Sequence, residues 1–122
     1  MGYQTLNFEV SAGVATITLN RPNNMNAMSP AMGAELHEVA LAIDANQDIR
    51  AVILTGAGKV FCAGGDLGEF AAAGDGARTL IMKMTGDLHL ALSRLARNAA
   101  PVIAAVNGTA AGAGFSLLMA AD

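Results

Sequence analysis

Two short runs of small residues are the parts of this sequence best suited to bind a reactive oxygen. They are Phe61-Cys62-Ala63-Gly64-Gly65-Asp66-Leu67 and Asn107-Gly108-Thr109-Ala110-Ala111-Gly112-Ala113-Gly114. Each follows an apolar segment rich in β-branched residues and precedes a segment compatible with a helix. Glycine and alanine let a ligand approach backbone N–H groups, and the start of a helix adds unpaired N–H donors. The two turns therefore predict two N–H donors directed at one oxygen, which is the arrangement of an oxyanion hole.

Few side chains near these runs are suited to nucleophilic or acid–base chemistry. Cys62 has no histidine close to it in sequence, so we expect a small buried residue rather than a catalytic thiol. Asp66 directly follows a glycine pair, and a cap on the next helix is favoured over direct catalysis. Neither His37 nor His89 has a second histidine at a metal-ligand spacing. Both are therefore expected at ordinary helix positions, and no metal site is predicted.

The elements that must position these runs can be read from the periodicity of the apolar residues. Residues 3–20 alternate as a hairpin with a turn at 11–13, and the proline that follows ends the pattern. A helix is predicted from Ser29-Pro30 to about Asn46, with a capping hydroxyl before a proline. Its apolar positions are expected to be Met32, Leu36, Val39, Ala40 and Ile43. A strand is expected at 51–55. A second helix is expected from about residue 78, with apolar positions at Leu80, Ile81, Met84, Leu88, Leu92 and Leu95.

Composition is that of one globular α/β domain. The 122 residues include 53% hydrophobic residues, enough for a core, and 14 glycines with only 14% charged residues. A net charge of −3, without a stripe of basic and aromatic residues, argues against nucleic acid as a partner. One cysteine excludes an internal disulfide, and the first five residues lack the features of a signal peptide. These observations predict a cytoplasmic protein.

One uncharged stretch has the length of a membrane span. Residues 98–121 carry no charge and could in principle cross a bilayer. However, Pro101 and Asn107-Gly108 interrupt the stretch, and alanine and glycine dominate the residues after 107. We therefore predict a buried strand at 102–106 followed by a buried helix, and no contact with a membrane.

Four strings in the same order closely resemble the crotonase (enoyl-CoA hydratase/isomerase) superfamily. They are Asn20-Arg21-Pro22, Asn26-Ala27-Met28 and the two runs of small residues. The resemblance extends over residues 3–122 and includes the spacings between the strings. It implies a crotonase-like β/β/α spiral core and an acyl-CoA thioester as substrate, so that coenzyme A is part of the substrate and no separate cofactor is needed. It also implies a homo-oligomer, either a trimer or a dimer of trimers.

The resemblance also assigns site residues. It places the two oxyanion donors at the N–H groups of Gly65 and Ala113, with Gly112 or Gly114 as alternatives if the register shifts by one. In the family, the loop that contains Asn26 and Ala27 runs beside the CoA moiety, so both are implied as substrate-binding residues. The other substrate-binding residues implied are Ala63, Gly64, Asp66, Leu67 and Gly112.

One position departs from the hydratase branch of the family. Those members carry a glutamate just after the second turn, whereas the matching residue here is Ser116. Because a hydroxyl has no useful basicity near neutral pH, the resemblance favours an isomerase-like proton transfer over two-glutamate hydration. No acid–base residue is identified, and Asp122 matches a structural aspartate of the family. Residues 1–122 are therefore expected to form a single, partial acyl-CoA-binding domain that lacks the C-terminal helical part.

Other functions remain open on the sequence alone. A non-catalytic half-domain that binds acyl-CoA or a partner protein fits the missing base. A dinucleotide-binding Rossmann unit fits the strand at 102–106 followed by Gly112-Ala113-Gly114, although the third glycine of its motif is replaced by Leu117. A serine hydrolase using Ser116 lacks the closing glycine of a nucleophile elbow.

Overall fold

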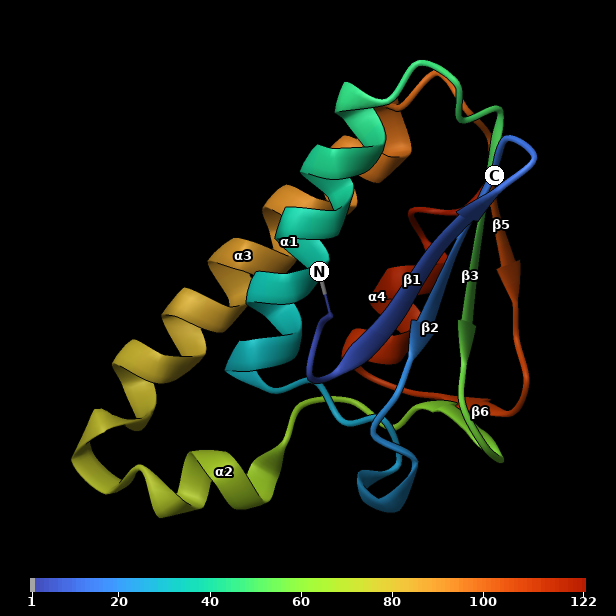
Figure 1. Ribbon diagram of the computed structural model, residues 1–122. Helices are drawn as coiled ribbons and strands as arrows, with labels where there is room; N and C mark the ends of the chain where they lie inside the picture. The colour runs from blue at the N-terminus through green and yellow to red at the C-terminus, as the bar shows by residue number, and fades with distance from the viewer. Residues whose placement is uncertain (1) are drawn as a thin grey trace.

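The computed structural model describes residues 2–122 and consists of a four-stranded sheet with helices on one face (Figure 1). The strands are β1 (Leu6–Ser11), β2 (Val14–Leu19), β3 (Ala51–Gly56) and β5 (Val102–Ala105), in the spatial order β1-β2-β3-β5. β1 pairs with β2 antiparallel, whereas the β2–β3 and β3–β5 pairs are parallel. The connections between the parallel strands carry the two long helices, α1 (Pro30–Ala45) and α3 (Ala77–Arg97).

A second, two-stranded sheet lies beyond the ends of the parallel strands. Its strands are β4 (Val60–Cys62) and β6 (Thr109–Ala110), which pair in parallel. Two short helices follow them, α2 (Leu67–Ala72) after β4 and α4 (Ala113–Leu118) after β6. Two 3-10 turns, Pro22–Asn24 and Gly74–Gly76, complete the structure. Figure 1 shows α2 and β6 at the same end of the main sheet, which is where β3 and β5 end.

The predicted hairpin is confirmed as β1 and β2. Its two-residue connection, Ala12-Gly13, has positive φ at both positions, 51° and 81°. This is the backbone of the primed turns that match the twist of paired strands. Glycine meets the requirement at the second position without a steric cost.

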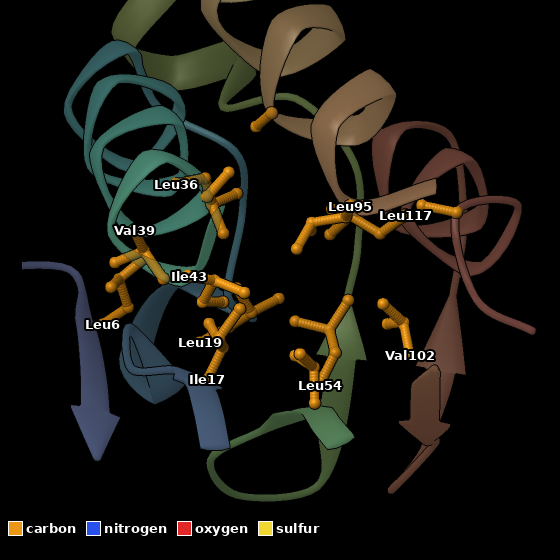
Figure 2. Packing of buried hydrophobic residues seen from close by; sticks show 14 of the residues in the cluster. Leu6, Ile17, Leu19, Leu36, Val39, Ile43, Leu54, Leu95, Val102 and Leu117 are labelled. Atoms are coloured by element: carbon orange, nitrogen blue, oxygen red, sulfur yellow. The ribbon is translucent and has the colours of Figure 1, made fainter. Parts of the chain in front are cut away.

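The start of α1 follows from its sequence. The Ser29 hydroxyl accepts a hydrogen bond from the Met32 N–H at 3.2 Å, and Pro30 occupies the first helical position. The predicted apolar positions of this helix, Met32, Leu36, Val39, Ala40 and Ile43, are all buried. They face the alternate buried residues of β2 and β3, as Figure 2 shows for Leu36, Ile17 and Leu54.

The expectation of a buried strand at 102–106 followed by a buried helix is wrong, because each element is buried along one side only. On β5, Val102 is buried but Ile103 is 53% exposed, and on α4, Leu117 is buried but Phe115 is 59% exposed. Among the described residues β5 is an edge strand, and the sheet face opposite α1 is not covered by a helix. Alternation along the strand therefore leaves every second side chain in solvent.

The N-terminal segment is held on α1 by one carboxylate. Glu35 accepts hydrogen bonds from the N–H of Gln4 at 2.9 Å, from the N–H of Thr5 at 2.8 Å and from the Thr5 hydroxyl. Partial burial tends to raise the pKa of Glu35, but these three hydrogen bonds together lower it below its ordinary value. A lowered folded-state pKa means that this stabilisation is complete above the unfolded pKa, near 4.5, and is lost as pH falls through the folded pKa.

We therefore expect Glu35→Ala to lower the free energy of unfolding at pH 7 by about 1 kcal/mol, a value discounted because the carboxylate is partly exposed. Urea unfolding at pH 7 and at pH 3 measures the difference, which should shrink at the lower pH. Glu38→Ala on the exposed face of the same helix is the control and should change stability little. An equal loss at both pH values for Glu35→Ala would contradict the role of the carboxylate.

Candidate functional site

The two runs of small residues, the first turn (residues 61–67) and the second turn (residues 107–114), lie against each other. β4 and β6 begin the contact, and the Ala111 N–H continues it by donating to the Cys62 carbonyl at 3.1 Å. A side chain at Gly108 would overlap the Lys59 carbonyl, and one at Gly114 would overlap the Cys62 carbonyl. Glycine at both positions therefore allows the second run to pack directly on the backbone of the first.

The N–H of Gly65 points away from the neighbouring segment of the same chain, which contains Met28. Met28 donates its N–H to the Gly64 carbonyl at 2.6 Å and accepts from the Asp66 N–H at 2.9 Å, forming a parallel bridge centred on Gly65. In such a bridge the central residue directs its own N–H to the opposite side. No hydrogen-bond partner for the Gly65 N–H occurs within residues 2–122.

The N–H of Ala113 is unpaired for a different reason. Ala113 is the first residue of α4, and the first N–H groups of a helix have no partner within the helix. Gly112 precedes it with φ 53° and ψ −120°, a conformation that favours glycine. A Cβ at Gly112 would lie 3.5 Å from the Gly64 Cα, so the two turns touch at their glycines. The described part of the chain offers the Ala113 N–H no partner either.

Asp66 is the expected helix cap and also forms an ion pair. One carboxylate oxygen accepts from the Glu69 N–H at 3.0 Å, and the other contacts the Arg21 guanidinium at 2.9 Å. The Glu69 N–H, together with the Arg21 cation, holds the pKa of Asp66 below its ordinary value despite the opposing effect of burial. Arg21 also donates to the Ala27 carbonyl at 2.6 Å. It thus joins the loop at residues 21–28 to the first turn, a role that the sequence did not reveal.

Loss of this ion pair has a predictable pH signature. We expect Asp66→Ala to lower the free energy of unfolding at pH 7 by about 1–2 kcal/mol, because it removes the cap and leaves Arg21 unpaired. Since the folded pKa is lowered, the contribution should be lost as pH falls below the unfolded value near 3.8. Asp66→Asn, which keeps the cap acceptor, is the control in thermal unfolding and should cost clearly less. An equal loss of stability for the two variants would mean that the helix cap does not stabilise the fold.

A cavity of about 400 Å³ opens between this loop and the first turn. Of the predicted site residues, Ala27, Ala63, Gly65, Asp66 and Leu67 line it. The full set of lining residues is Asn23, Asn24, Met25, Ala27, Ala63, Gly65, Asp66, Leu67 and Gly68. Leu67 is 77% exposed and Met25 57%, so the cavity has two large apolar side chains at its rim. Such a cavity suits a ligand with both apolar and hydrogen-bonding groups.

Asn26 does not face this cavity. It has no exposed surface, and its side chain is hydrogen-bonded to backbone groups of three residues, Arg21, Ala57 and Val60. The expected substrate contact from Asn26 is therefore replaced by a supporting position behind the loop. Gly64 is likewise buried, beneath Gly112. The remaining predicted residues, Gly112 and Ala113, lie on the second turn where it meets the first.

Ser116, Asp122 and Cys62 are each poorly placed for acid–base chemistry. Ser116 is exposed, and its hydroxyl lies 3.4 Å from the Gly112 carbonyl, a long hydrogen bond that gives no support for a nucleophile. The Asp122 carboxylate accepts from the Val102 N–H at 2.7 Å, as a structural residue would. Burial raises the pKa of the Cys62 thiol, which therefore stays neutral, as expected of a buried small residue.

No group of three or more His, Cys, Asp or Glu side chains that could hold a metal ion is found among the described residues. In that part of the chain, no helix combines the length and apolar character needed to cross a bilayer.

Comparison with known proteins decides the family. The profile of the Enoyl-CoA hydratase/isomerase family matches residues 9–122. The chain belongs to this family. The expected mixed α/β crotonase-like fold is confirmed by solved structures of family members, and the dinucleotide-binding alternative is overturned. A dinucleotide-binding unit would need the glycines at 112–114 to follow β5 directly. Here β6 lies between β5 and these glycines and pairs with β4.

Individual relatives match almost the whole chain but only part of their own length. A probable enoyl-CoA hydratase from Rhodobacter capsulatus is 45% identical over 123 residues, covering 100% of this chain and 46% of the relative. The 1,2-epoxyphenylacetyl-CoA isomerase of Escherichia coli is 42% identical over 114 residues, covering 93% of this chain and 44% of the isomerase. The structure of an enoyl-CoA hydratase from Mycobacterium smegmatis has a TM-score of 0.88 at 38% identity, and the match covers 98% of this chain and 46% of the hydratase chain. The chain thus spans about half the length of these relatives.

Proposed function

We propose that this chain binds an acyl-CoA thioester and polarises its carbonyl through the N–H groups of Gly65 and Ala113. The observation that carries the proposal is that both N–H groups are unpaired within the described residues and lie on two turns that touch at Gly64 and Gly112. Donors of this kind stabilise the negative charge that collects on a thioester oxygen when a proton leaves the neighbouring carbon. Family membership supports a CoA thioester as the ligand.

The cavity beside the first turn supports the placement of the CoA moiety. Its walls combine exposed apolar side chains, Met25 and Leu67, with the polar groups of Asn23 and Asn24. Ala27, Ala63, Gly65 and Asp66 also line it, so a ligand there would end next to the Gly65 N–H. We assign the pantetheine arm and its thioester to this cavity.

The proposed chemistry is an isomerase-like proton transfer. A proton leaves the α-carbon, charge collects on the thioester oxygen between the two N–H groups, and a proton returns at another carbon. Ser116 cannot supply the second carboxylate of a two-glutamate hydration, because a hydroxyl is not basic enough. Asp66 is engaged by the Glu69 N–H and by Arg21, so we do not assign it the acid–base role.

The chain acts in this proposal as one partial acyl-CoA-binding domain, residues 1–122, of a homo-oligomer. A trimer or a dimer of trimers is the assembly expected from the family resemblance. The second candidate function is acyl-CoA binding without chemistry on this chain. The observation that favours it is that the carboxylates of Asp66 and Asp122 are both held in hydrogen bonds with backbone N–H groups.

Titration of the chain with an acyl-CoA and, separately, with NADH tests the ligand class. Saturable binding of the acyl-CoA, displaced by free coenzyme A, is expected, and NADH should not compete. Incubation of the complex in heavy water then separates the two functions. Exchange of the α-proton supports catalysis, whereas binding without exchange supports the second candidate. Absence of any acyl-CoA binding would contradict both.

A further inference from the structure

The carbonyl oxygen of Val60 accepts hydrogen bonds from two asparagine side chains. Asn26 donates its amide N–H to this oxygen at 2.8 Å, and Asn107 donates to it at 3.2 Å. Val60 begins β4, which leads into the first turn, and Asn107 begins the run that forms the second turn. The hydrogen bond from Asn107 to the Val60 carbonyl therefore joins the segment that precedes Gly65 to the segment that precedes Ala113.

The remaining hydrogen-bonding capacity of Asn26 is also used. Its side-chain oxygen accepts from the Arg21 N–H at 2.8 Å, and its amide donates a second bond to the Ala57 carbonyl at 3.0 Å. Asn26 itself has φ 51°, a conformation that asparagine adopts more readily than most residues. Because the side chain is fully buried and fully bonded, its loss leaves backbone groups without partners.

Asn107 makes a matching set of contacts from the other side. Its oxygen accepts from the Gly56 N–H at 3.1 Å, and its amide also donates to the Gly58 carbonyl at 2.9 Å. A Cβ at Gly56 would lie 3.0 Å from both the Asn107 oxygen and the Asn26 nitrogen. The two amide groups thus meet around Gly56 and Val60, with no room for a larger residue between them.

We propose that Asn26 and Asn107 are paired positioning residues that set the relative placement of the Gly65 and Ala113 N–H groups. Neither asparagine is assigned a contact with substrate. Each fixes the loop at residues 56–60 through two or more backbone bonds, and both share the Val60 oxygen. Movement of one side chain therefore alters the bonds of the other, and with them the alignment of the two turns. The catalytic meaning of this pairing rests on the proposed function, whereas its geometric part stands without it.

The test uses backbone amide resonances of the chain without ligand. Asn107→Asp keeps an acceptor for the Gly56 N–H but replaces both donated bonds with carboxylate–carbonyl repulsion. We expect the Gly65 and Ala113 amide resonances to shift, although neither contacts residue 107. Asn107→Ser, a smaller change at the same exposed position, is the second variant if the first fails to fold. Unchanged Gly65 and Ala113 resonances in a folded variant would overturn the proposal.

Asn98 provides the matched control. Its side chain also accepts from a backbone N–H, that of Ala100 at 2.8 Å, and donates once, to Asp44 at 2.5 Å. It caps the C-terminal end of α3, and Figure 1 shows this end of the helix far from α2 and β6. Asn98→Asp should therefore lower stability while leaving the Gly65 and Ala113 resonances in place. A shift of these resonances in the control would mean that they report general loosening rather than positioning.

A double-mutant cycle tests the shared acceptor. Asn26→Ala and Asn107→Ala, alone and together, are compared by urea unfolding. Residues that share a hydrogen-bond partner are expected to depart from additivity, here by at least about 3-fold in the unfolding equilibrium constant. Additive effects would overturn the pairing.

An acyl-CoA titration of the same variants separates this inference from the proposed function. Failure of the unchanged chain to bind acyl-CoA would count against the proposed function alone, because the resonance and unfolding tests need no ligand. If the unchanged chain binds, we expect Asn107→Asp to weaken binding at least about 10-fold, as the loss of one aligned hydrogen bond to the thioester oxygen implies. Asn98→Asp should bind as the unchanged chain does. Equal binding by Asn107→Asp would overturn the positioning role.

Discussion

Gly65→Pro is expected to reduce proton transfer at the α-carbon of an acyl-CoA by on the order of 100- to 1,000-fold. Proline has no N–H, so the substitution removes one of the two proposed oxyanion donors. The residue before it, Gly64, has φ 116° and no side chain to clash with the proline ring. The measurement is α-proton exchange in heavy water by a form of the protein that turns over an acyl-CoA. In this chain, the corresponding readout is the affinity for an acyl-CoA.

Gly65→Ala is the control that separates the N–H from the space around it. Alanine keeps the donor but places a Cβ 2.9 Å from the Phe70 ring, which must then shift. We expect an intermediate loss, recovered in part when Phe70→Leu is added to make room. If Gly65→Pro and Gly65→Ala lose the same activity, the loss comes from the Phe70 contact, and the assignment of the Gly65 N–H is wrong.

Gly114→Ala is expected to lower the free energy of unfolding by about 1–3 kcal/mol and to abolish acyl-CoA binding. The added methyl group would overlap the Cys62 carbonyl and lie 2.9 Å from the Cys62 Cβ. The backbone atoms around Cys62 belong to β4 and cannot rotate away as a flexible side chain could. The second turn must therefore move off the first. Thermal unfolding and acyl-CoA titration measure the two effects.

Gly86→Ala is the matched control for this substitution. Gly86 lies within α3, and an added Cβ there would meet no atom within 4 Å. Alanine in the middle of a helix is favoured over glycine by about 0.5–1 kcal/mol, so this variant should be slightly more stable. If both alanine variants behave alike, close contact between the two turns is not what requires Gly114.

Much of the fold follows from local patterns in the sequence. The turn at Ala12-Gly13 and the Ser29-Pro30 helix start are local features, and each was predicted from residues next to one another. The apolar positions of α1 were also predicted correctly, because its 3.6-residue periodicity is regular. On α3 the pattern missed Ala91, which is buried although it is small, and Leu80 is only half-buried.

The long-range contacts of the site could not be predicted in this way. Arg21 and Asp66 are 45 residues apart, and the bond from the Gly56 N–H to the Asn107 side chain spans 51 residues. Neither pair has a periodicity or a local turn signal. Asn26 was assigned to the ligand side of its loop by resemblance alone, whereas burial places it behind the loop. The packing of β4 on β6 and the bridge between Met28 and Gly65 bring these residues together in the folded chain.

The extent of burial at the C-terminal end also depends on tertiary context. An apolar run such as residues 102–106 predicts a strand but does not say whether one or both of its faces are covered. Here the helices cover one face, so Val102 is buried while Ile103 remains exposed. The composition of residues 113–118 likewise does not say whether one or all sides of α4 are covered.

The carbonyl signal of a bound acyl-CoA labelled with ¹³C at the thioester carbon tests the central claim most directly. Two N–H donors on the thioester oxygen polarise the carbonyl, which moves its ¹³C resonance downfield and lowers its stretching frequency. We expect both changes when the labelled acyl-CoA binds this chain, and a smaller change with Gly65→Pro. A bound acyl-CoA whose carbonyl signal equals that of the free thioester would contradict the assignment of Gly65 and Ala113 as oxyanion donors.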